Sequence, residues 1–262
     1  MVNSDIRRSE INDRIEKKGS VSISELAVNF KVSDMTIRRD LIKLEKMSII
    51  RRVHGGAVAF YGRSFEPPLI SRSNKNISIK QLIGRYAAKM VVDGDSIAMD
   101  VGSTTMEMAM NLIGRQNLTI VTPNLHIANL LGDESQIRVI VAGGIVRRGE
   151  KSLIGDLAYY TFREVNVDKL FLGTGGIDSK AGLTEHDMQD AQVRKEMIRC
   201  AKEVVLLTDS SKFQQIAFAY FADFSQIDHL VCEKEPSDEL LMALKAANVV
   251  IHIVNSESEY IM

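Results

Sequence analysis

Apolar residues recur at helical spacing in three segments at the start of the chain. These segments cover about residues 4–18, 22–30 and 34–47. The second segment opens with the Ser-x-x-Glu spacing of a capping box, at Ser22 and Glu25. Only a short turn separates it from the third segment. The pattern therefore predicts a small helical domain that contains a helix-turn-helix.

The third segment divides its residues between two faces. At about 100° per residue, Ile37, Leu41 and Leu44 fall in one narrow stripe, which we expect to face the core. The opposite face is polar and basic, and a serine stands at the N-cap position. A recognition helix uses such a face in the major groove of DNA, where arginine is well suited to guanine. The candidate DNA-contacting residues are Ser33, Met35, Thr36, Arg38, Arg39 and Lys43.

A β-hairpin is predicted directly after this helix. In "IIRRVHGGAVAF", two β-rich runs flank a His-Gly-Gly turn. Arg52 on the first strand and His54 in the turn are candidates for contacts with DNA, and no cluster of metal-ligating residues surrounds His54. The hairpin completes a winged helix-turn-helix domain, expected over residues 1–59. The alternative, a small helical bundle with a solvated basic face, does not account for the hairpin.

The rest of the chain has a different pattern. Residues 60–79 break the periodicity, and Pro67-Pro68 opposes helix formation, so this segment is predicted to be a linker. From residue 80 onward, helical segments alternate with short apolar runs. This alternation is typical of an α/β domain with a largely parallel sheet that is buried on both faces. We expect this larger domain, which also mediates oligomerisation, to span residues 80–262.

Small, polar or charged residues follow five of the predicted strands. These strands are expected over residues 95–101, 118–122, 137–142, 169–173 and 203–208. Because ligands bind outside the carboxyl ends of parallel strands, the five strand ends together predict a binding site. An ordinary turn explains any one of these loops, but explains all five less readily.

The chemistry of the strand ends favours a phosphorylated sugar. The segment "DVGSTT" offers backbone N–H groups, hydroxyls and a helix N-terminus to a phosphate, and a lysine adds positive charge. The candidate phosphate-binding residues are Gly102, Ser103, Thr104, Thr105 and Lys212. The candidates for contact with the sugar are Asp100, Asn124, Gly143, Arg147, Gly175, Gly176, Asp178 and Asp209. The P-loop spacing and a complete G-x-G-x-x-G are absent, so we expect no nucleotide cofactor, and we also expect no metal.

Composition and charge add two constraints. Residues 1–58 carry 12 lysines and arginines against 8 acidic residues, a net of +4, whereas the remainder carries 21 against 26, a net of −5. Residues 1–58, which we call the head, are thus basic, and the remainder of the chain is acidic. This difference suggests a polyanionic partner for the head alone. No apolar run is long enough for a membrane helix, and the N-terminus lacks a signal-peptide core, so we expect a cytoplasmic protein. Cys200 and Cys232 are expected to be buried free thiols.

The segments "SDMTIRRDLIKLE" and "IIRRVHGGAV" resemble the N-terminal signature of the DeoR family of bacterial transcription regulators. Further segments, "DVGSTT", "GGIVRRGEKSLIG", "GTGGID", "GLTEHDMQDAQVRKEMI" and "DSSKF", resemble the effector domain of that family, a relative of ribose-5-phosphate isomerase that binds phosphorylated sugars. The resemblance implies a repressor, a dimer or tetramer, and a palindromic or repeated operator in double-stranded DNA. Asp190 and Arg194 depart from it, because the family usually has Glu and Lys there.

Three functions remain open at this point. In the first, the larger domain senses a phosphosugar and changes the DNA affinity of the head. In the second, it isomerises a phosphosugar, with Asp178 or Glu185 as the base. In the third, the larger domain only holds an architectural DNA-binding protein together. We favour the sensor, because an isomerase needs no recognition helix and oligomerisation needs no polar strand ends.

Overall fold

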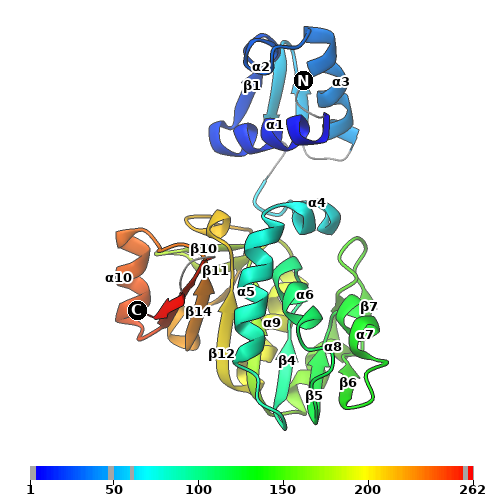
Figure 1. The fold of residues 1–262 in the computed structure, drawn as a ribbon, viewed down its shortest axis with the longest axis vertical. Helices are drawn as coiled ribbons and strands as arrows, with labels where there is room; N and C mark the ends of the chain where they lie inside the picture. The colour runs from blue at the N-terminus through cyan, green and yellow to red at the C-terminus, as the bar shows by residue number, and fades with distance from the viewer. Residues whose placement is uncertain (1–3, 47–49, 60–61, 256–258, 262) are drawn as a thin grey trace. The chain divides into compact units, whose positions relative to one another are not determined.

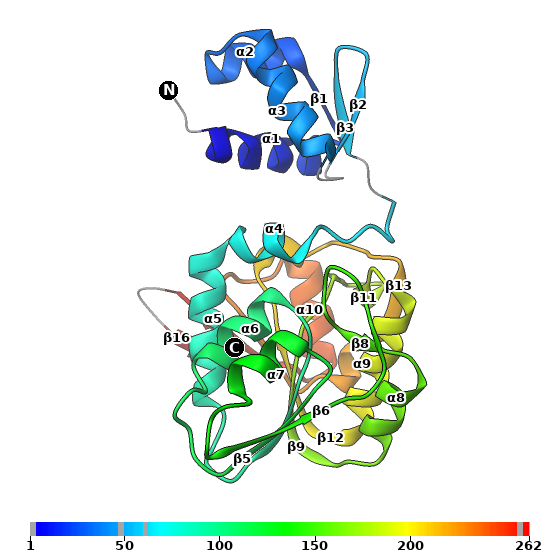
Figure 2. The ribbon, with the colours of Figure 1, turned by 90° about the vertical axis from the view of Figure 1, so that its right-hand side faces the viewer.

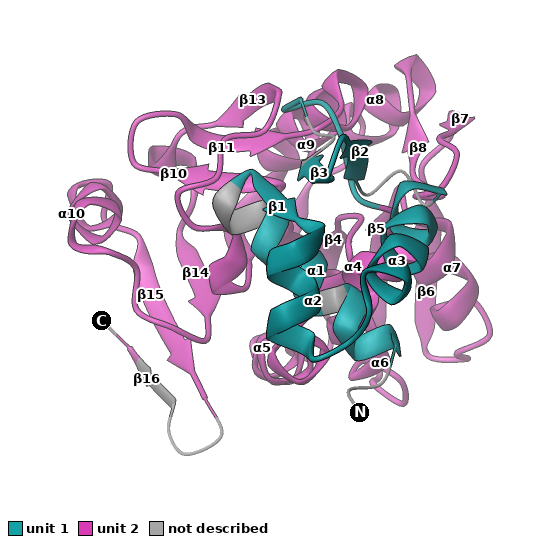
Figure 3. Ribbon diagram, turned by 90° about the horizontal axis from the view of Figure 1, so that it is seen from above, with its two compact units in different colours: residues 1–67 teal, residues 68–262 magenta. Residues whose placement is uncertain are grey.

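The computed structural model divides into two compact units, residues 1–67 and 68–262, which Figure 3 shows in different colours. It describes residues 4–46, 50–59, 62–255 and 259–261. The division falls within the segment expected to be a linker, of which residues 60 and 61 lie outside the described ranges. The later part of that segment is helical, because a helix begins at Leu69. Pro68 stands at its N-cap, where the missing N–H of proline loses no helical hydrogen bond.

The described part of unit 1 forms a winged helix-turn-helix. Its elements are α1 (Ser4–Lys18), β1 (Ser20–Ser22), α2 (Ile23–Phe30), α3 (Asp34–Lys46), β2 (Ile50–Val53) and β3 (Gly56–Ala59) (Figure 1). Both predicted N-caps are confirmed. Ser22 Oγ accepts a hydrogen bond from Glu25 N at 3.1 Å, and Ser33 Oγ accepts one from Thr36 N at 3.2 Å. The predicted apolar stripe of α3 is buried in the core of this unit.

The wing holds a third strand that the sequence pattern does not predict. Strand β1 pairs antiparallel with β3, and Val21 lies opposite Ala57. The two backbones approach so closely that a Cβ at Gly56 would lie 2.1 Å from the Val21 carbonyl oxygen. Glycine is therefore required at this position. Because β1 leads directly into α2, the wing and the helix-turn-helix are joined by backbone hydrogen bonds.

A buried ion pair connects the first and third helices of unit 1. Arg7 Nε lies 2.6 Å from Asp40 Oδ2, and Arg8 Nη1 lies 3.2 Å from Asp40 Oδ1. Asp40 is only 3% exposed. The carboxylate thus stands on the buried side of the recognition helix, with two arginines of α1 neutralising it.

Unit 2 is a doubly wound α/β fold. Its helices and strands are α4 (Leu69–Asn74), α5 (Ile77–Lys89), β4 (Ser96–Met99), α6 (Ser103–Met110), β5 (Leu118–Thr122), α7 (Leu125–Leu131), β6 (Ile137–Val141), β7 (Ile145–Val146), β8 (Leu153–Ile154), α8 (Asp156–Arg163), β9 (Val167–Leu172), β10 (Gly176–Asp178), β11 (Gly182–Glu185), α9 (Met188–Cys200), β12 (Ala201–Leu207), β13 (Ala219–Ala222), β14 (His229–Cys232), α10 (Asp238–Ala246), β15 (Val250–Val254) and β16 (Glu259–Ile261).

The large sheet of unit 2 is parallel except for β16, and it is covered on both faces (Figures 1 and 2). Alternate residues of one strand enter different cores. In β9, Leu170 and Leu172 pack with α8, α9 and α10, whereas Phe171 packs with α5, α6 and α7. The predicted sheet, buried on both faces, is thereby confirmed. Two small antiparallel additions are not predicted by the sequence, the ribbon β7–β8 and the sheet β10–β11–β13.

Both cysteines are buried free thiols, as their apolar surroundings predict. Burial raises the pKa of Cys200 to about 11 and that of Cys232 to about 12, so both stay protonated at neutral pH. Among the described helices, none is long and apolar enough to cross a membrane.

Candidate functional site

The five selected strand ends lie along one edge of the large sheet. The strand order is β6-β5-β4-β9-β12-β14-β15-β16, so the five strands are consecutive neighbours. Strands β4, β5 and β6 lie side by side in chain order toward one end of the sheet. The next strand of this sheet, β9, lies on the other side of β4, and β12, β14 and β15 follow it toward the opposite end. At such a reversal, open α/β sheets bind their ligands outside the carboxyl ends of the strands. The loops after β4 and β9 meet there.

The loop after β4 ends at the N-terminus of α6. Gly102 is its N-cap residue, with φ at +148°, and Ser103 and Thr104 are the first helical residues. Thr105 is fully buried, and its hydroxyl donates to the Gly102 carbonyl at 3.0 Å. The N-terminus therefore offers backbone N–H groups and two hydroxyls to an anion, whereas the third predicted hydroxyl serves the helix itself.

A buried arginine stands beneath this edge. Arg194 Nε lies 2.8 Å from Asp100 Oδ2, and its Nη1 lies 2.8 Å from Glu185 Oε2, although not aligned as a hydrogen bond. Asp100 Oδ2 also accepts from Gly173 N at 3.0 Å. Asp100 is 1% exposed, and its Oδ2 accepts from two protein donors, so its contact with the sugar stays a prediction. The arrangement instead fixes the loops after β4 and β9 to α9.

Burial and charge act in opposite directions on these groups. Burial raises the pKa of Asp100, although Arg194 opposes the rise. Burial also acts to raise the pKa of Glu185, but Arg194 and His186 outweigh it and lower that pKa. Burial would lower the pKa of Arg194, and the carboxylates of Asp100 and Glu185 raise it instead. Arg194 is thus a fixed positive charge between two carboxylates.

Arg147 and Asp190 form a second ion pair at the same edge. Arg147 Nη1 lies 2.7 Å from Asp190 Oδ2, and its Nε lies 3.5 Å from Asp187 Oδ2. This contact joins the ribbon β7–β8 to the first turn of α9. The structure therefore assigns contacts to Asp190 and Arg194, whose roles the sequence leaves open. It also gives Arg147 a protein partner at the position where a ligand contact is expected.

Lys80 is a member of the site that the sequence analysis misses. It is 4% exposed, and its ammonium donates to the carbonyls of Arg72 and of Lys75, the latter at 2.7 Å. Burial lowers the pKa of Lys80 to about 8, Asp209 opposes this, and Lys212 contributes by repulsion. A signal was present, since Lys80 occupies the apolar stripe of α5 at i, i+3, i+4 and i+7.

Asp209 follows β12 and faces this lysine. Its Oδ1 accepts from Ser211 N at 3.1 Å and from Asn76 Nδ2 at 3.0 Å. Burial acts to raise the pKa of Asp209, but these two hydrogen bonds and the charges of Lys80 and Lys212 lower it. Asp209 is thus a buried carboxylate that holds the start of α5 to the end of β12.

Two of the remaining polar candidates, Asn124 and Asp178, accept hydrogen bonds from backbone N–H groups close to them in the chain. Asn124 caps α7 by accepting from two backbone N–H groups, at 2.9 and 3.3 Å. Asp178 closes the turn between β10 and β11, accepting from two backbone N–H groups at 2.9 Å. Ser152, which forms an isolated bridge with Asn124, is 1% exposed, and its hydroxyl has no hydrogen-bond partner among the described residues. Ser152 is a second site residue that the sequence analysis misses.

The candidate glycines allow close packing of the backbone. A Cβ at Gly176 would lie 2.3 Å from the Gln215 carbonyl oxygen, and one at Gly175 would lie 3.0 Å from Glu185 Oε1. Gly143 follows β6 and is exposed. Gly175 and Gly176 therefore serve the local fold beside Glu185, whereas Gly143 remains open to solvent.

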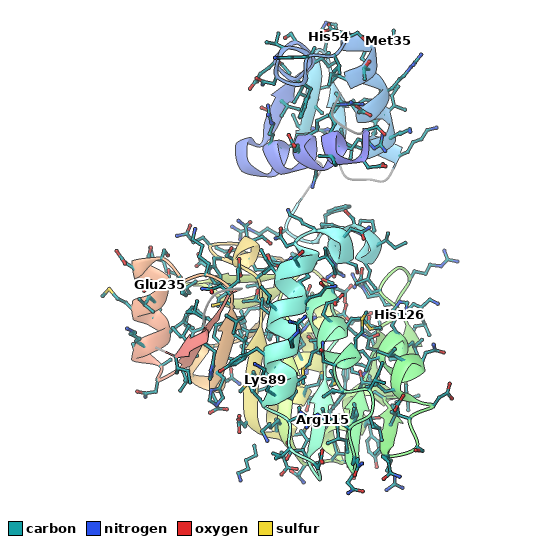
Figure 4. The ribbon with its side chains drawn as sticks, in the orientation of Figure 1. Met35, His54, Lys89, Arg115, His126 and Glu235 are labelled. Carbon is teal, nitrogen blue, oxygen red and sulfur yellow. The ribbon has the colours of Figure 1, made fainter. Side chains whose placement is uncertain are left out.

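In unit 1, the polar face of α3 and the wing are accessible. Met35 is 58% exposed, and Figure 4 shows it and His54 at the end of this unit away from α1. Arg52 is an exception, because its side chain pairs with Glu45 at 2.6 Å. The other candidates are Ser33, which caps α3, the half-buried Thr36, and the exposed Arg38, Arg39 and Lys43.

Comparisons with known proteins match most of the chain to a single family. A family model described as the DeoR-like helix-turn-helix domain matches residues 7–61, and one described as the DeoR C terminal sensor domain matches residues 75–234. The glycerol-3-phosphate regulon repressor of Escherichia coli (strain K12) is 31% identical over 247 residues, which cover 94% of this chain and 98% of that protein. An uncharacterized HTH-type transcriptional regulator of Bacillus subtilis (strain 168) is 34% identical over 230 residues, covering 87% and 91%.

Among solved structures, ribose 5-phosphate isomerase A from Methanocaldococcus jannaschii aligns at 20% identity with a TM-score of 0.40, over 53% of this chain and 55% of that chain. The family models and the relatives carry the assignment. The sensor-domain model alone matches more than half of the chain, and the relatives match almost all of it. The chain therefore belongs to the DeoR family of transcriptional regulators, and it is a regulator rather than an enzyme.

Proposed function

We propose that this regulator represses a sugar-catabolic operon and leaves its operator DNA when a phosphorylated sugar binds unit 2. One observation carries the proposal. Lys80 and Lys212 lie close enough to repel each other, and the charge of Lys80 also acts on Glu107 of α6. A phosphate between the lysines and the N-terminus of α6 would remove this repulsion. At its pKa of about 8, Lys80 is still mostly protonated at neutral pH.

The sugar would extend from the phosphate toward the ribbon β7–β8. Ser152 offers a buried hydroxyl with no partner in the described structure, and a buried polar group of this kind favours a hydrogen-bonding ligand. Arg147 and Asp190 offer a charged pair that can rearrange toward sugar hydroxyls. The isomerase alternative is not favoured, because the carboxylate of Glu185 is paired with Arg194 and that of Asp178 closes a turn.

Lys80 also provides a route from the ligand to the DNA-binding unit. Its ammonium holds the carbonyls of Arg72 and Lys75, at the end of α4. Helix α4 is the first element after the division between the units. A phosphate that draws the ammonium away would release these carbonyls and loosen α4. Coupling of this kind is typically worth about 1–3 kcal/mol.

Replacing Arg39 is expected to weaken operator binding without affecting the effector. Arg39→Ala removes an exposed arginine from the polar face of α3, and a bidentate contact with guanine is worth about 1–3 kcal/mol. The dissociation constant for operator DNA should therefore rise about 10- to 100-fold. Fluorescence anisotropy at a stated salt concentration measures it. Lys202→Ala, an exposed site on β12 of unit 2, is the charge-matched control, and an equal loss there would contradict the assignment.

Replacing Lys212 is expected to have the opposite effect. Lys212→Ala should bind operator DNA normally but lose about 10- to 100-fold in affinity for the effector, because hydrogen bonds to charged groups contribute about 1.5–3 kcal/mol. Titration of the protein–DNA complex with the effector measures this. Lys180→Ala, whose side chain is 86% exposed, is the matched control. A normal response of Lys212→Ala to the effector would exclude Lys212 from the phosphate site.

The proposal is tested by titrating the protein on the DNA upstream of its own operon with a panel of phosphorylated sugars and their unphosphorylated counterparts. We expect one phosphorylated sugar to release the DNA at sub-millimolar concentration and to be recovered unchanged. Release by an unphosphorylated sugar would contradict the phosphate site. Failure of every phosphorylated sugar to alter DNA binding would overturn the sensor proposal.

A further inference from the structure

Unit 2 exposes a group of apolar side chains on its outer surface. These side chains take part neither in the core around the large sheet nor in the ion pairs at the carboxyl ends of its strands. They lie at the end of β6, on β7 and on α8, and strand β8 contacts both β7 and α8. We call this group the α8–β7 face, and its members are Val141, Ile145, Leu157 and Tyr160. Their exposed fractions run from 44% to 67%. Single exposed apolar residues are ordinary, but a cluster of this kind marks an interaction surface.

Close contacts join α8 to the loop after β6 and to Ile145 of β7. A Cβ at Gly143 would lie 3.1 Å from Leu157 Cβ, and one at Gly155 would lie 3.8 Å from Ile145 Cδ1. Tyr160 follows Leu157 by three residues, so the two side chains neighbour each other on the outer side of α8. The glycines keep the ribbon close to the helix, and the larger apolar side chains project between them.

The distribution of charge on α8 fits one occupant in particular. At about 100° per residue, Tyr160 points away from the buried Ala158 and Phe162, and Asp156 and Arg163 lie together on one side of it, at the two ends of the helix. Asp156 begins the helix and Arg163 ends it, and both are exposed. Two such helices packed antiparallel about a two-fold axis would bring Asp156 of each copy against Arg163 of the other, with the two Tyr160 rings at the centre.

We propose that the α8–β7 face is the interface through which two copies of this chain associate. The area supports this occupant. Four apolar side chains exposed to this degree present on the order of 500 Å² per copy, within the range of the largest patches on monomers. Burying the face of both copies would remove on the order of 1,000 Å², which reaches the lower limit of specific interfaces. Arg163 already contacts Glu196 at 2.8 Å, and 54% of its side chain remains exposed for a partner.

The test is the molecular mass of the assembly that the full chain forms in solution, measured by sedimentation equilibrium over a range of protein concentrations. The wild-type protein should associate to a multiple of 29.2 kDa. The double variant Leu157→Glu and Tyr160→Glu should associate at least about 30-fold more weakly, the loss that one strong interface residue carries. Met242→Glu, at a position on α10 that is 71% exposed, is the matched control and should associate like the wild type.

A second variant keeps the test decisive if the double variant does not fold. Asp156→Arg changes one exposed charge and would place like charges across the interface, so its association should weaken at low salt and recover at high salt. Circular dichroism confirms the fold of each variant. A wild-type protein that stays monomeric, or a folded Leu157→Glu and Tyr160→Glu variant that associates normally, would overturn the proposal. Equal weakening by Met242→Glu would also overturn it.

Discussion

Arg194→Met is expected to lower the free energy of unfolding of unit 2 by about 3–5 kcal/mol, because removing one partner of a buried ion pair leaves its counter-charges uncompensated. Methionine preserves most of the volume of the side chain, but Asp100 and Glu185 would remain buried beside it without the positive charge of Arg194. Urea unfolding followed by circular dichroism measures the loss, as a fall in the midpoint of the transition assigned to this unit.

Arg199→Met is the matched control for this experiment. Arg199 stands on the same helix, contacts Glu196 at 3.4 Å and has a side chain that is 72% exposed. Its replacement should change the stability by no more than about 1 kcal/mol. Equal effects of the two variants would show that the position of Arg194 between two carboxylates carries no special stability. Arg194→Lys, which keeps the positive charge, should lie between them, since one ammonium cannot reproduce the fork of a guanidinium.

Asp40→Asn is expected to abolish operator binding by unfolding the head. The change removes the carboxylate charge that Arg7, which is 7% exposed, contacts at 2.6 Å, and the loss from a broken buried pair is about 3–5 kcal/mol. A unit of this size buries a small core, so its free energy of unfolding is small and a loss of this size is enough to unfold it. Calorimetry should show the loss or a strong downward shift of the transition assigned to the head.

Asp34→Asn is the control for the head, since Asp34 is exposed in the first turn of the same helix. It should lower the stability by less than about 1 kcal/mol, through the helix dipole alone. Effector binding measured by calorimetry should survive in both variants, because the effector is assigned to unit 2. Operator binding by Asp40→Asn at wild-type affinity would contradict the role given to the ion pair.

The sequence predicts those parts of the fold in which local pattern and tertiary structure agree. The N-caps Ser22 and Ser33 and the apolar stripe of α3 depend on residues within one turn of each other, and all are found in place. The five strands are also predicted, because strands buried on both faces must be apolar throughout. Strand β1 is missed, since three residues carry too little pattern and its pairing with β3 comes from the close approach at Gly56.

The candidate site is predicted in position but not in its contacts. The position follows from topology, because parallel strands place their carboxyl ends on one edge. The contacts depend on side chains that are distant in sequence, and Asp100 and Arg194 are separated by 94 residues. No local pattern distinguishes a carboxylate that will meet a ligand from one that will meet an arginine. Lys80 differs, since its place in the apolar stripe of α5 is a local signal, and only its contacts with Arg72 and Lys75 depend on the folded structure.

The close approach of β1 to β3 has a further consequence for DNA binding. Because the Val21 carbonyl leaves no room for a side chain at Gly56, the wing cannot move independently of the strand that begins the helix-turn-helix. The two elements expected to meet DNA are therefore preorganised relative to each other. The entropy of orienting them is lost once, during folding, and does not weaken each encounter with an operator.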